Sequence, residues 1–294
     1  MRVFVTGATG FVGSAVVAEL LANGHEVLGL ARSDASAAQL AQMGADVLRG
    51  TIQDHDALRR GASEADGVAH LAFNHDFSKF AENVADDVGA IETIGTALEG
   101  SGRPLIVTSG LALQPAGPIA TESDNPGPHF PRRSEAAAAA AAAKGVRASA
   151  VRLPPSTHGK GDHGFVPTLI NIAREKGVAA YVGDGQNRWS ATHRADAARV
   201  FRLALERGGE GGPFHAVAEE SIPFRQIAEA IGKGLNLPVT SVAPNEAEAH
   251  FGWFATFAAM DLAASSARTR ALLDWTPTQP GLLTDMAQNG YFDA

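Results

Sequence analysis

The sequence predicts an α/β fold: a doubly wound, parallel Rossmann sheet followed by a smaller carboxy-terminal α/β substrate lobe. Along the first two thirds of the 294 residues, short apolar segments bounded by glycine or polar turns alternate with segments of helical periodicity. The short segments are continuously apolar, as expected of parallel strands that are buried on both faces. After Leu153 a glycine-rich polar loop interrupts the alternation, which predicts the change of lobe.

The first predicted unit is a strand over residues 3–6, a glycine turn, and a helix over residues 11–22 that ends at Asn23-Gly24. Alanine is the best helix former, so residues 134–144 are predicted to be a helix, and its smooth face is a candidate homodimer interface. A helix over residues 224–231 is predicted to start at Ser221, with Pro223 in its first turn. The other predicted strands are residues 26–30, 46–48, 68–72, 105–108, 148–153 and 214–217.

These elements predict two regions. Residues 1–153 form a dinucleotide-binding domain. Residues 154–294 are mostly the substrate lobe, with segments around 188–218 returning to the Rossmann sheet.

The composition excludes several classes of function. A formal charge of −8 argues against a general binder of nucleic acid or of anionic membranes. The chain has no cysteine, which excludes disulfides, thiolate metal sites and a cysteine nucleophile. No run of about 18 apolar residues occurs, and the first motif follows the initial methionine directly. We therefore expect a cytoplasmic protein whose partner is a small-molecule substrate.

A glycine motif occupies the turn between the first strand and the first helix. Residues 6–13 read Thr-Gly-Ala-Thr-Gly-Phe-Val-Gly. Gly7 permits a tight turn, Gly10 lets the backbone approach a pyrophosphate, and Gly13 lets the helix pack close to the sheet. The helix amino terminus then presents N–H groups and a positive dipole end to the phosphates. This context predicts that a nicotinamide dinucleotide binds here.

The end of the second strand indicates which dinucleotide binds. An acidic residue there would bind the ribose 2′-hydroxyl, whereas the chain has Arg32 and Ser33. A guanidinium can pair with a 2′-phosphate through two hydrogen bonds. The sequence therefore favours NADP(H) over NAD(H), the alternative being that Arg32 is a solvated loop residue.

The glycine motif in this setting resembles that of the extended short-chain dehydrogenases/reductases, the group that includes sugar-nucleotide epimerases. Residues 66–72, 152–155, 183–185, 192–198 and 272–277 resemble further family segments in the same order. The resemblance implies the Rossmann fold and a nicotinamide cofactor. It places the cofactor against Gly7, Thr9, Gly10, Phe11, Val12, Gly13, Arg32, Ser33, Ile52, Leu71, Ala72, Phe73, Thr108, Pro154 and Pro155.

The chain departs from the family at the catalytic pair. The family uses a tyrosine with a lysine four residues later, but Tyr181 and Tyr291 have no such lysine. The corresponding segment contains His129 and Arg133 at the same spacing, which resembles an atypical subgroup with His-x-x-x-Arg in place of Tyr-x-x-x-Lys. A second alignment places Pro131 and Glu135 at these positions and leaves no acid or base. We prefer the first because it retains a chemically competent pair.

The candidate catalytic residues are His129, Arg133 and Ser109. Histidine titrates near neutrality and can exchange a proton with the substrate, although a neighbouring arginine disfavours its charged form. Arg133 cannot release a proton and can only hold a ribose or an anion. Ser109 or Thr108 can polarise a carbonyl, although some alignments place the catalytic position at Gly110. Candidate substrate-binding residues in the neighbouring loops are Asn74, His75, His158 and His163, and no metal site is expected.

Together these features predict an NADP(H)-dependent oxidoreductase with an atypical active site. It would transfer a hydride to or from a small organic carbonyl or alcohol. One alternative is an NADP(H)-sensing binding protein that has lost catalysis. A second alternative is a nucleotide-sugar epimerase or dehydratase, although such enzymes usually use NAD(H), which Arg32 disfavours.

Overall fold

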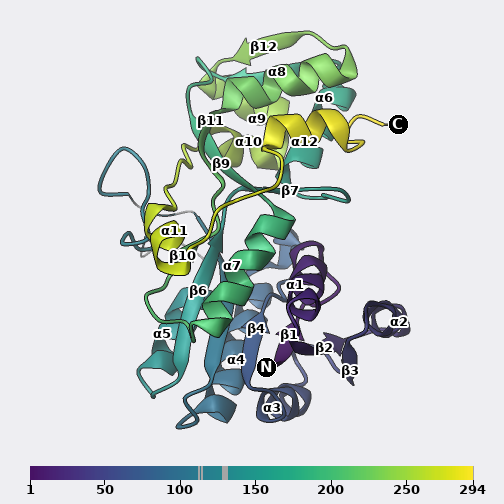
Figure 1. The fold of residues 1–294 in the computed structure, drawn as a ribbon. Coiled ribbons are helices and arrows are strands. Elements are labelled where there is room, and N and C mark those ends of the chain that lie inside the picture. Colours follow the sequence, from purple (N-terminus) through teal and green to yellow (C-terminus); the bar gives the residue numbers. More distant parts are fainter. Residues whose placement is uncertain (112, 114, 128–131, 294) are drawn as a thin grey trace.

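A computed structural model describes the whole chain except residues 112, 114, 128–131 and 294 (Figure 1). Its centre is a seven-stranded sheet in which every strand pair is parallel. The strand order is β10-β6-β5-β4-β1-β2-β3. Chain order therefore reverses between β1 and β4, which is the crevice where α/β sheets of this type bind ligands. The strands are β1 (Arg2–Thr6), β2 (Glu26–Ala31), β3 (Asp46–Arg49), β4 (Gly67–His70), β5 (Pro104–Gly110), β6 (Arg147–Leu153) and β10 (Phe214–His215).

Helices cover both faces of this sheet. The helices α1 (Phe11–Ala22), α2 (Asp34–Met43) and α7 (Arg194–Glu206) share one buried core with the sheet. The helices α3 (His55–Ser63), α4 (Phe80–Leu98) and α5 (Ser134–Ala142) share the core on the opposite face. The sheet is thus doubly wound, which confirms the predicted fold class.

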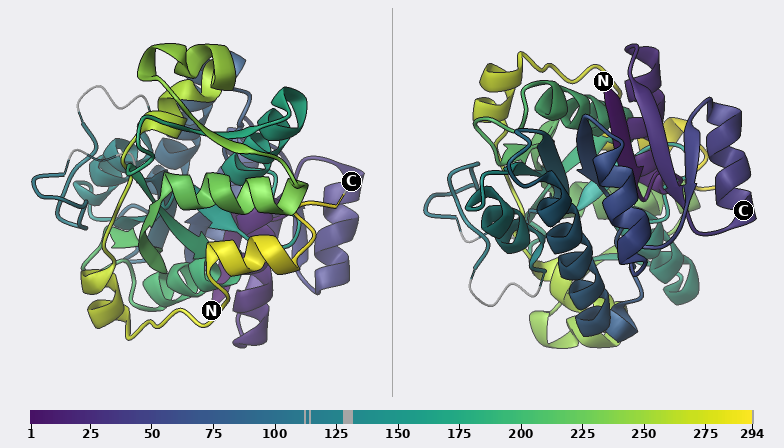
Figure 2. Two further views of the ribbon diagram at one scale, coloured as in Figure 1. Left: turned by 90° about the horizontal axis from the view of Figure 1, so that it is seen from above. Right: turned by 90° about the horizontal axis from the view of Figure 1, so that it is seen from below.

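The carboxy-terminal lobe lies at the carboxyl edge of the sheet, at the top of Figure 1. The third hydrophobic core of the protein lies in this lobe, around Trp189, Phe224 and Phe254. Seen from above, α8 and α12 lie side by side (Figure 2, left). The lobe and its connections contain a three-stranded sheet of β7 (Ser156–His158), β9 (Arg188–His193) and β11 (Glu219–Pro223), and a pair of β8 (Ala179–Val182) with β12 (Val239–Val242). The helices are α6 (Phe165–Lys176), α8 (Phe224–Leu235), α9 (Ala247–Phe251), α10 (Ala255–Ala259), α11 (Ala267–Leu273) and α12 (Leu282–Gln288), with short 3-10 turns at Phe77–Lys79, Pro244–Glu246 and Gly252–Phe254.

The structure corrects several predicted element bounds. The fourth strand ends at His70, because Leu71 and Ala72 leave the sheet and donate their N–H groups to Thr6. Ser221 does not start a helix: it belongs to β11, which pairs with β9, and α8 begins at Phe224.

Three further segments differ from their predicted extents. The strand predicted at residues 214–217 is only Phe214–His215, and α5 ends at Ala142. Of the segment 188–218, β10 joins the main sheet and α7 packs against it, whereas β9 belongs to the small sheet.

Among the described residues, no helix has the length and apolar character needed to cross a membrane.

Candidate functional site

The glycine turn is pressed between the end of β4 and the start of α1. Gly7 has φ of 65°, and a Cβ there would lie 2.6 Å from the backbone nitrogen of Ala72. A Cβ on Gly13 would lie 2.0 Å from the carbonyl oxygen of Gly7, so only glycine allows α1 to start this close. Gly10 caps the helix without a side-chain hydrogen bond. The amino-terminal N–H groups of α1 are therefore left to an anion, which fits the pyrophosphate of a dinucleotide.

A polar group lies where β2 and β3 end, beside the glycine turn. Ser33 caps α2, and its Oγ accepts from the Ser36 amide at 3.2 Å and donates to Ser36 Oγ at 3.0 Å. Thr9 Oγ1 of the glycine turn lies 3.5 Å from Ser36 Oγ. Arg32 is exposed and makes no hydrogen bond to the described residues.

Sequence reasoning missed Arg49 in this group. Arg49 ends β3, where it is the parallel partner of Ala31, and it donates to the Ser33 carbonyl at 2.6 Å and to Asp34 at 2.8 Å. The signal was present, because parallel neighbours end at the same edge of a sheet. Ile52, the predicted cofactor contact in this region, lies partly buried in the turn after β3.

The ends of β4, β5 and β6 form the other part of the crevice. Leu71, Ala72 and Phe73 follow β4 directly. The Thr108 hydroxyl donates to the His70 carbonyl at 3.0 Å, which ties β5 to β4. The Ser109 side chain is buried and makes no hydrogen bond to the described residues. A Cβ at Gly110 would meet no atom within 4 Å, so this strand end is open. The predicted Pro154 and Pro155 follow β6 at the same edge.

A chain of buried hydrogen bonds joins the glycine turn to the segment before α5. Thr6 Oγ1 lies 2.9 Å from His70 Nδ1, and His70 Nε2 lies 3.2 Å from Asp87 Oδ1. Ser134 donates to Asp87 Oδ2 at 2.5 Å, and Arg132 Nε donates to Ser134 Oγ at 2.9 Å. Because a carboxylate only accepts, His70 donates from Nε2 to Asp87. We call Thr6, His70, Asp87, Ser134 and Arg132 the buried relay.

The charges of the relay are balanced within the protein. Burial alone would raise the pKa of the Asp87 carboxyl, but the hydrogen bond and charge of His70, the charge of Arg132 and the Ser134 hydrogen bond lower it below its usual value. Burial lowers the pKa of the Arg132 guanidinium, and the charges of Asp87 and Glu135 oppose this effect. Arginine stays protonated in proteins, so a carboxylate and a guanidinium face each other across one serine hydroxyl.

Two aromatic rings, those of Phe73 and Phe11, contact the cationic and titratable side chains of the site. The Arg132 guanidinium lies 4.2 Å above the Phe73 ring, and the His75 ring meets the same ring edge-on at 5.4 Å. His163 meets Phe11 edge-on at 5.7 Å. Burial, the charge of Arg132 and then that of His163 lower the pKa of His75. The structure thus brings together His75 and His163, which were predicted from separate loops, with Arg132, which was not predicted.

The other histidine of the lobe loop has a structural position. His158 is fully buried on β7, and its Nδ1 lies 2.8 Å from Asp285 on α12. Tyr291 donates to Asp162 at 2.9 Å and accepts from the Gly159 amide at 3.1 Å. The Tyr291 contacts fix the loop that contains His163. His158 itself is part of the buried core of the lobe and has no contact with solvent. Among the described residues no group of three or more His, Asp or Glu is arranged to hold a metal.

The predicted pair His129 and Arg133 is placed only in part. His129 lies outside the described residues, and Arg133 is exposed at the start of α5, where its side chain makes no hydrogen bond to the described residues. Glu135, the alternative position, pairs with Arg152 through hydrogen bonds of 2.9 and 2.7 Å. Arg152 also donates to His215 at 3.2 Å. Asn74 is exposed in the loop after β4, where its side chain accepts from the Asp76 amide.

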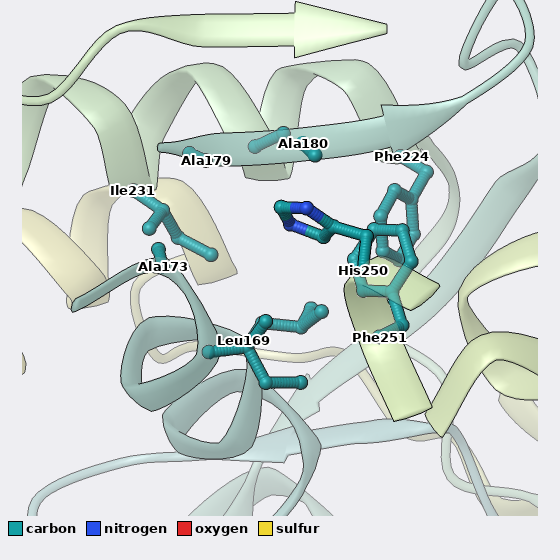
Figure 3. Close-up of a pocket in the computed structure, with 10 residues that line it drawn as sticks. Leu169, Ala173, Ala179, Ala180, Phe224, Ile231, His250 and Phe251 are labelled. Carbon is teal, nitrogen blue, oxygen red and sulfur yellow. The ribbon is translucent and has the colours of Figure 1, made fainter. Parts of the chain in front are cut away.

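Two hollows are found among the described residues. A groove of about 610 Å³ runs along α5 and β6, and its lining includes Arg132, Arg133, Glu135, Arg152 and the alanines of the helix. A cavity of about 10 Å³ lies inside the lobe, where Leu169, Phe224 and His250 surround it (Figure 3). The second has room for no more than about one water molecule. Neither hollow includes the glycine turn, so the site is assigned from the crevice at the carboxyl ends of the strands.

The fold and the glycine turn define an α/β protein with the crevice of a dinucleotide-binding fold. The model described as the NAD dependent epimerase/dehydratase family matches residues 3–103. An uncharacterized protein of Schizosaccharomyces pombe is 50% identical over 99% of this chain and 100% of its own length, and one of Saccharomyces cerevisiae is 46% identical over 98% and 99%. The chain therefore belongs to the NAD-dependent epimerase/dehydratase family.

Relatives and structures with named activities are more distant. The 2-alkyl-3-oxoalkanoate reductase of Stenotrophomonas maltophilia is 28% identical over 81% of this chain and 77% of its own length. The crystal structure of a dTDP-glucose 4,6-dehydratase from Streptomyces venezuelae, with NAD and TYD bound, has a TM-score of 0.77 and 22% identity over 99% of this chain and 96% of that chain. The second likeness shows the fold. Family and relatives support an enzyme of the oxidoreductase or dehydratase class.

Proposed function

We propose that this protein is an NADP(H)-dependent oxidoreductase that transfers a hydride between the cofactor and a small organic carbonyl or alcohol. The observation that carries the proposal is the polar and cationic group at the ends of β2 and β3. Arg32, Ser33, Ser36 and Arg49 offer hydroxyls and guanidinium groups where the ribose 2′-position would lie. A 2′-phosphate would supply acceptors for these hydroxyls and guanidinium groups, of which Arg49 is already paired with Asp34.

The residues at the crevice fit a dinucleotide. Gly7, Gly10 and Gly13 leave the space and the free N–H groups that the pyrophosphate requires. Leu71 to Phe73 and Pro154-Pro155 would border the nicotinamide, because they follow the strands on the far side of the switch point. When bound, the cofactor supplies or accepts the hydride at its nicotinamide ring.

His75 is the candidate for proton exchange. Its lowered pKa keeps the imidazole neutral at pH 7, so it can accept the proton of an alcohol. In the reverse direction the imidazolium is a stronger acid than an ordinary histidine and returns the proton to the alkoxide. The unbonded Ser109 hydroxyl is the candidate donor to the carbonyl oxygen. A reductase among the relatives supports the reaction class.

A second candidate function is an NADP(H)-sensing binding protein without turnover. In the second alignment Glu135 takes the position of the family's lysine. Its carboxylate is already paired with Arg152, which favours a protein without catalysis. No residue pair of the described chain reproduces the tyrosine and lysine of the family. This candidate predicts unequal affinities for NADP⁺ and NADPH in the absence of any reaction.

One experiment separates these functions. Purified protein is titrated with NADPH, NADP⁺, NADH and NAD⁺, and NADPH oxidation is then followed with a panel of small aldehydes, ketones and oxo acids. The oxidoreductase proposal expects tighter binding of the phosphorylated cofactors and turnover of at least one carbonyl. Binding without turnover would favour the sensor, and failure to bind any of the four cofactors would remove both.

A further inference from the structure

We infer that Arg132 is the receptor for a carboxylate on the substrate, so that the substrate class is a small oxo acid and its hydroxy acid counterpart. The inference rests on the proposed hydride transfer and deepens it. It begins with a contrast between Arg152, which is buried, and Arg132, which is half-buried. The two arginines differ in what their guanidinium groups are bonded to.

Arg152 is saturated by the protein. Both of its outer nitrogens and Nε have partners: Nε and Nη2 bond the two carboxylate oxygens of Glu135, and Nη1 contacts His215. This is the paired arrangement that a buried guanidinium normally adopts with a carboxylate. Arg152 therefore has no capacity for a ligand and serves to fix α5 against β6.

Arg132 lacks such a carboxylate. Its Nε donates to Ser134, its Nη2 donates to the Thr108 carbonyl at 3.0 Å, and its Nη1 makes no hydrogen bond to the described residues. The balancing charge is Asp87, which lies behind the Ser134 hydroxyl and does not bond the guanidinium directly. The relay thus stabilises the positive charge without occupying all of the donors. Within the described part of the chain, Nη1 of Arg132 is therefore a donor that no protein acceptor occupies.

The surroundings of Arg132 also favour an anion. His75 shares the Phe73 ring with Arg132, and both Arg132 and His163 act electrostatically on His75. The carboxylates beside these histidines are already bonded. Asp76 accepts from the amide and the hydroxyl of Ser78, and Asp162 accepts from the Gly164 amide and from Tyr291. A substrate carboxylate would therefore meet the fixed positive charge of Arg132, while these two acids are engaged elsewhere.

The position of Arg132 links this carboxylate to the reaction. Arg132 contacts Phe73 and the end of β5, next to the segment that would border the nicotinamide. A carboxylate held at Nη1 would bring an oxo acid next to the Phe73 ring, which both Arg132 and His75 contact. Bound NADPH would supply the hydride to the carbonyl carbon, and a protonated His75 would give its proton to the oxygen, which leaves the hydroxy acid, NADP⁺ and neutral His75.

The test compares a carboxylate with its neutral amide. Protein saturated with NADPH is titrated with oxamate and, separately, with oxamide, two probes of the same shape that differ in charge. Because a hydrogen bond to a charged group is stronger than one to a neutral group, we expect oxamate to bind at least about tenfold more tightly than oxamide. Equal binding of the two probes, or binding of neither, would overturn the inference.

Variants assign the preference to one arginine. Arg132→Gln should abolish the preference for oxamate, and Arg132→Lys should retain part of it because the charge remains. Arg133→Gln tests the neighbouring arginine that the sequence favoured, and loss of the preference in that variant instead would refute the assignment. Arg59→Gln, an exposed helix position paired with Asp56, is the remote control. Far-UV circular dichroism and Tm identify any variant that fails to fold.

The outcomes also distinguish this inference from the proposed function. Wild-type protein that binds NADPH and reduces neutral ketones, but binds oxamate no better than oxamide, retains the oxidoreductase function and loses the carboxylate receptor. Protein that shows the oxamate preference but reduces no carbonyl retains the receptor and loses the oxidoreductase function. Absence of NADPH binding removes both.

Discussion

The glycine turn and the relay around Arg132 lie along one edge of the same sheet, but they are built in different ways. The turn consists of eight consecutive residues, and its shape follows from backbone contacts such as that between Gly13 and the Gly7 carbonyl. The relay takes side chains from β1, β4, α4 and the start of α5. The first region therefore depends on local sequence and the second on tertiary packing, and single substitutions should separate the two kinds of dependence.

The largest effect is expected in the turn. Gly13→Ala places a Cβ 2.0 Å from a backbone oxygen that no side-chain rotation can move. The strain of about 3 kcal/mol falls on the turn that holds the phosphates, so we expect NADPH affinity to fall by at least about 100-fold. Isothermal titration calorimetry measures this change.

The matched control lies in α4. A Cβ at Gly89 would approach only the His55 side chain, at 3.5 Å. Gly89→Ala should leave NADPH affinity unchanged and raise stability by roughly 0.5–1 kcal/mol, because alanine loses less backbone entropy on folding. Comparable loss of NADPH affinity in both variants would show that the turn is not the specific determinant of binding.

Substitutions in the buried relay should lower the free energy of unfolding. Asp87→Ala removes the balancing carboxylate and leaves His70, Ser134 and Arg132 with unpaired polar groups inside the protein. Breaking a buried ion pair in this way costs about 3–5 kcal/mol, which urea denaturation can measure. Asp86→Ala, next along the helix and bonded to Gln53, should cost less than about 1 kcal/mol. Equal costs would mean that the relay contributes nothing special.

The same contrast explains what the sequence could predict. The fold, the turn and its cofactor class follow from local patterns, and the structure confirms the fold. Asp87 was missed although it falls on the apolar face of its helix with Ala90, Ile91 and Ile94, and an acid at such a position indicates a buried partner. That clue names no partner, because His70 and Ser134 come from segments 17 and 47 residues away.

The segment before α5 shows the limit most clearly. Matching the spacing of a tyrosine and a lysine selected Arg133, whereas the guanidinium that enters the relay belongs to Arg132. Neighbouring residues at a helix start point in different directions, so spacing alone does not decide which of the two arginines faces the protein. The prediction for Arg133 stays a prediction. Similarly, Ser221 has the chemistry of a helix cap but pairs in β11, because strand pairing with β9 outweighs the local preference.

A smaller effect should appear in the pH dependence of stability. Burial lowers the pKa of His215 to about 4, beside Arg152. An unfolded histidine has a pKa near about 6.5, so between these values only the unfolded chain takes up the proton. Stability is therefore complete above about pH 6.5 and falls as pH decreases toward 4, by up to about 1.4 kcal/mol per pH unit. Urea denaturation between pH 4 and 8 measures this slope.

His215→Asn keeps a donor toward the Ser265 carbonyl but has no titrating ring. We expect this variant to be less stable at pH 8 and to have a flatter profile between pH 6.5 and 4. An unchanged slope would assign the acid sensitivity to another group. Because His215 lies in the saturated Arg152 network, the result also tests whether that network is only structural.

The smallest effect is expected in the choice between NADPH and NADH, which we assign to the ends of β2 and β3. Arg49 reaches the loop after β2 through its bonds to Ser33 and Asp34, whereas Arg32 is local to that loop. Arg49→Ala should weaken NADPH binding about tenfold while leaving NADH binding within about twofold, the value of one surface charge contact of about 1.4 kcal/mol. Fluorescence titration of both cofactors measures the ratio. If only Arg32→Ala removes the preference for NADPH over NADH, the site for the 2′-phosphate depends on local sequence, as the glycine turn does. If Arg49→Ala also removes this preference, the same site depends on tertiary packing as well.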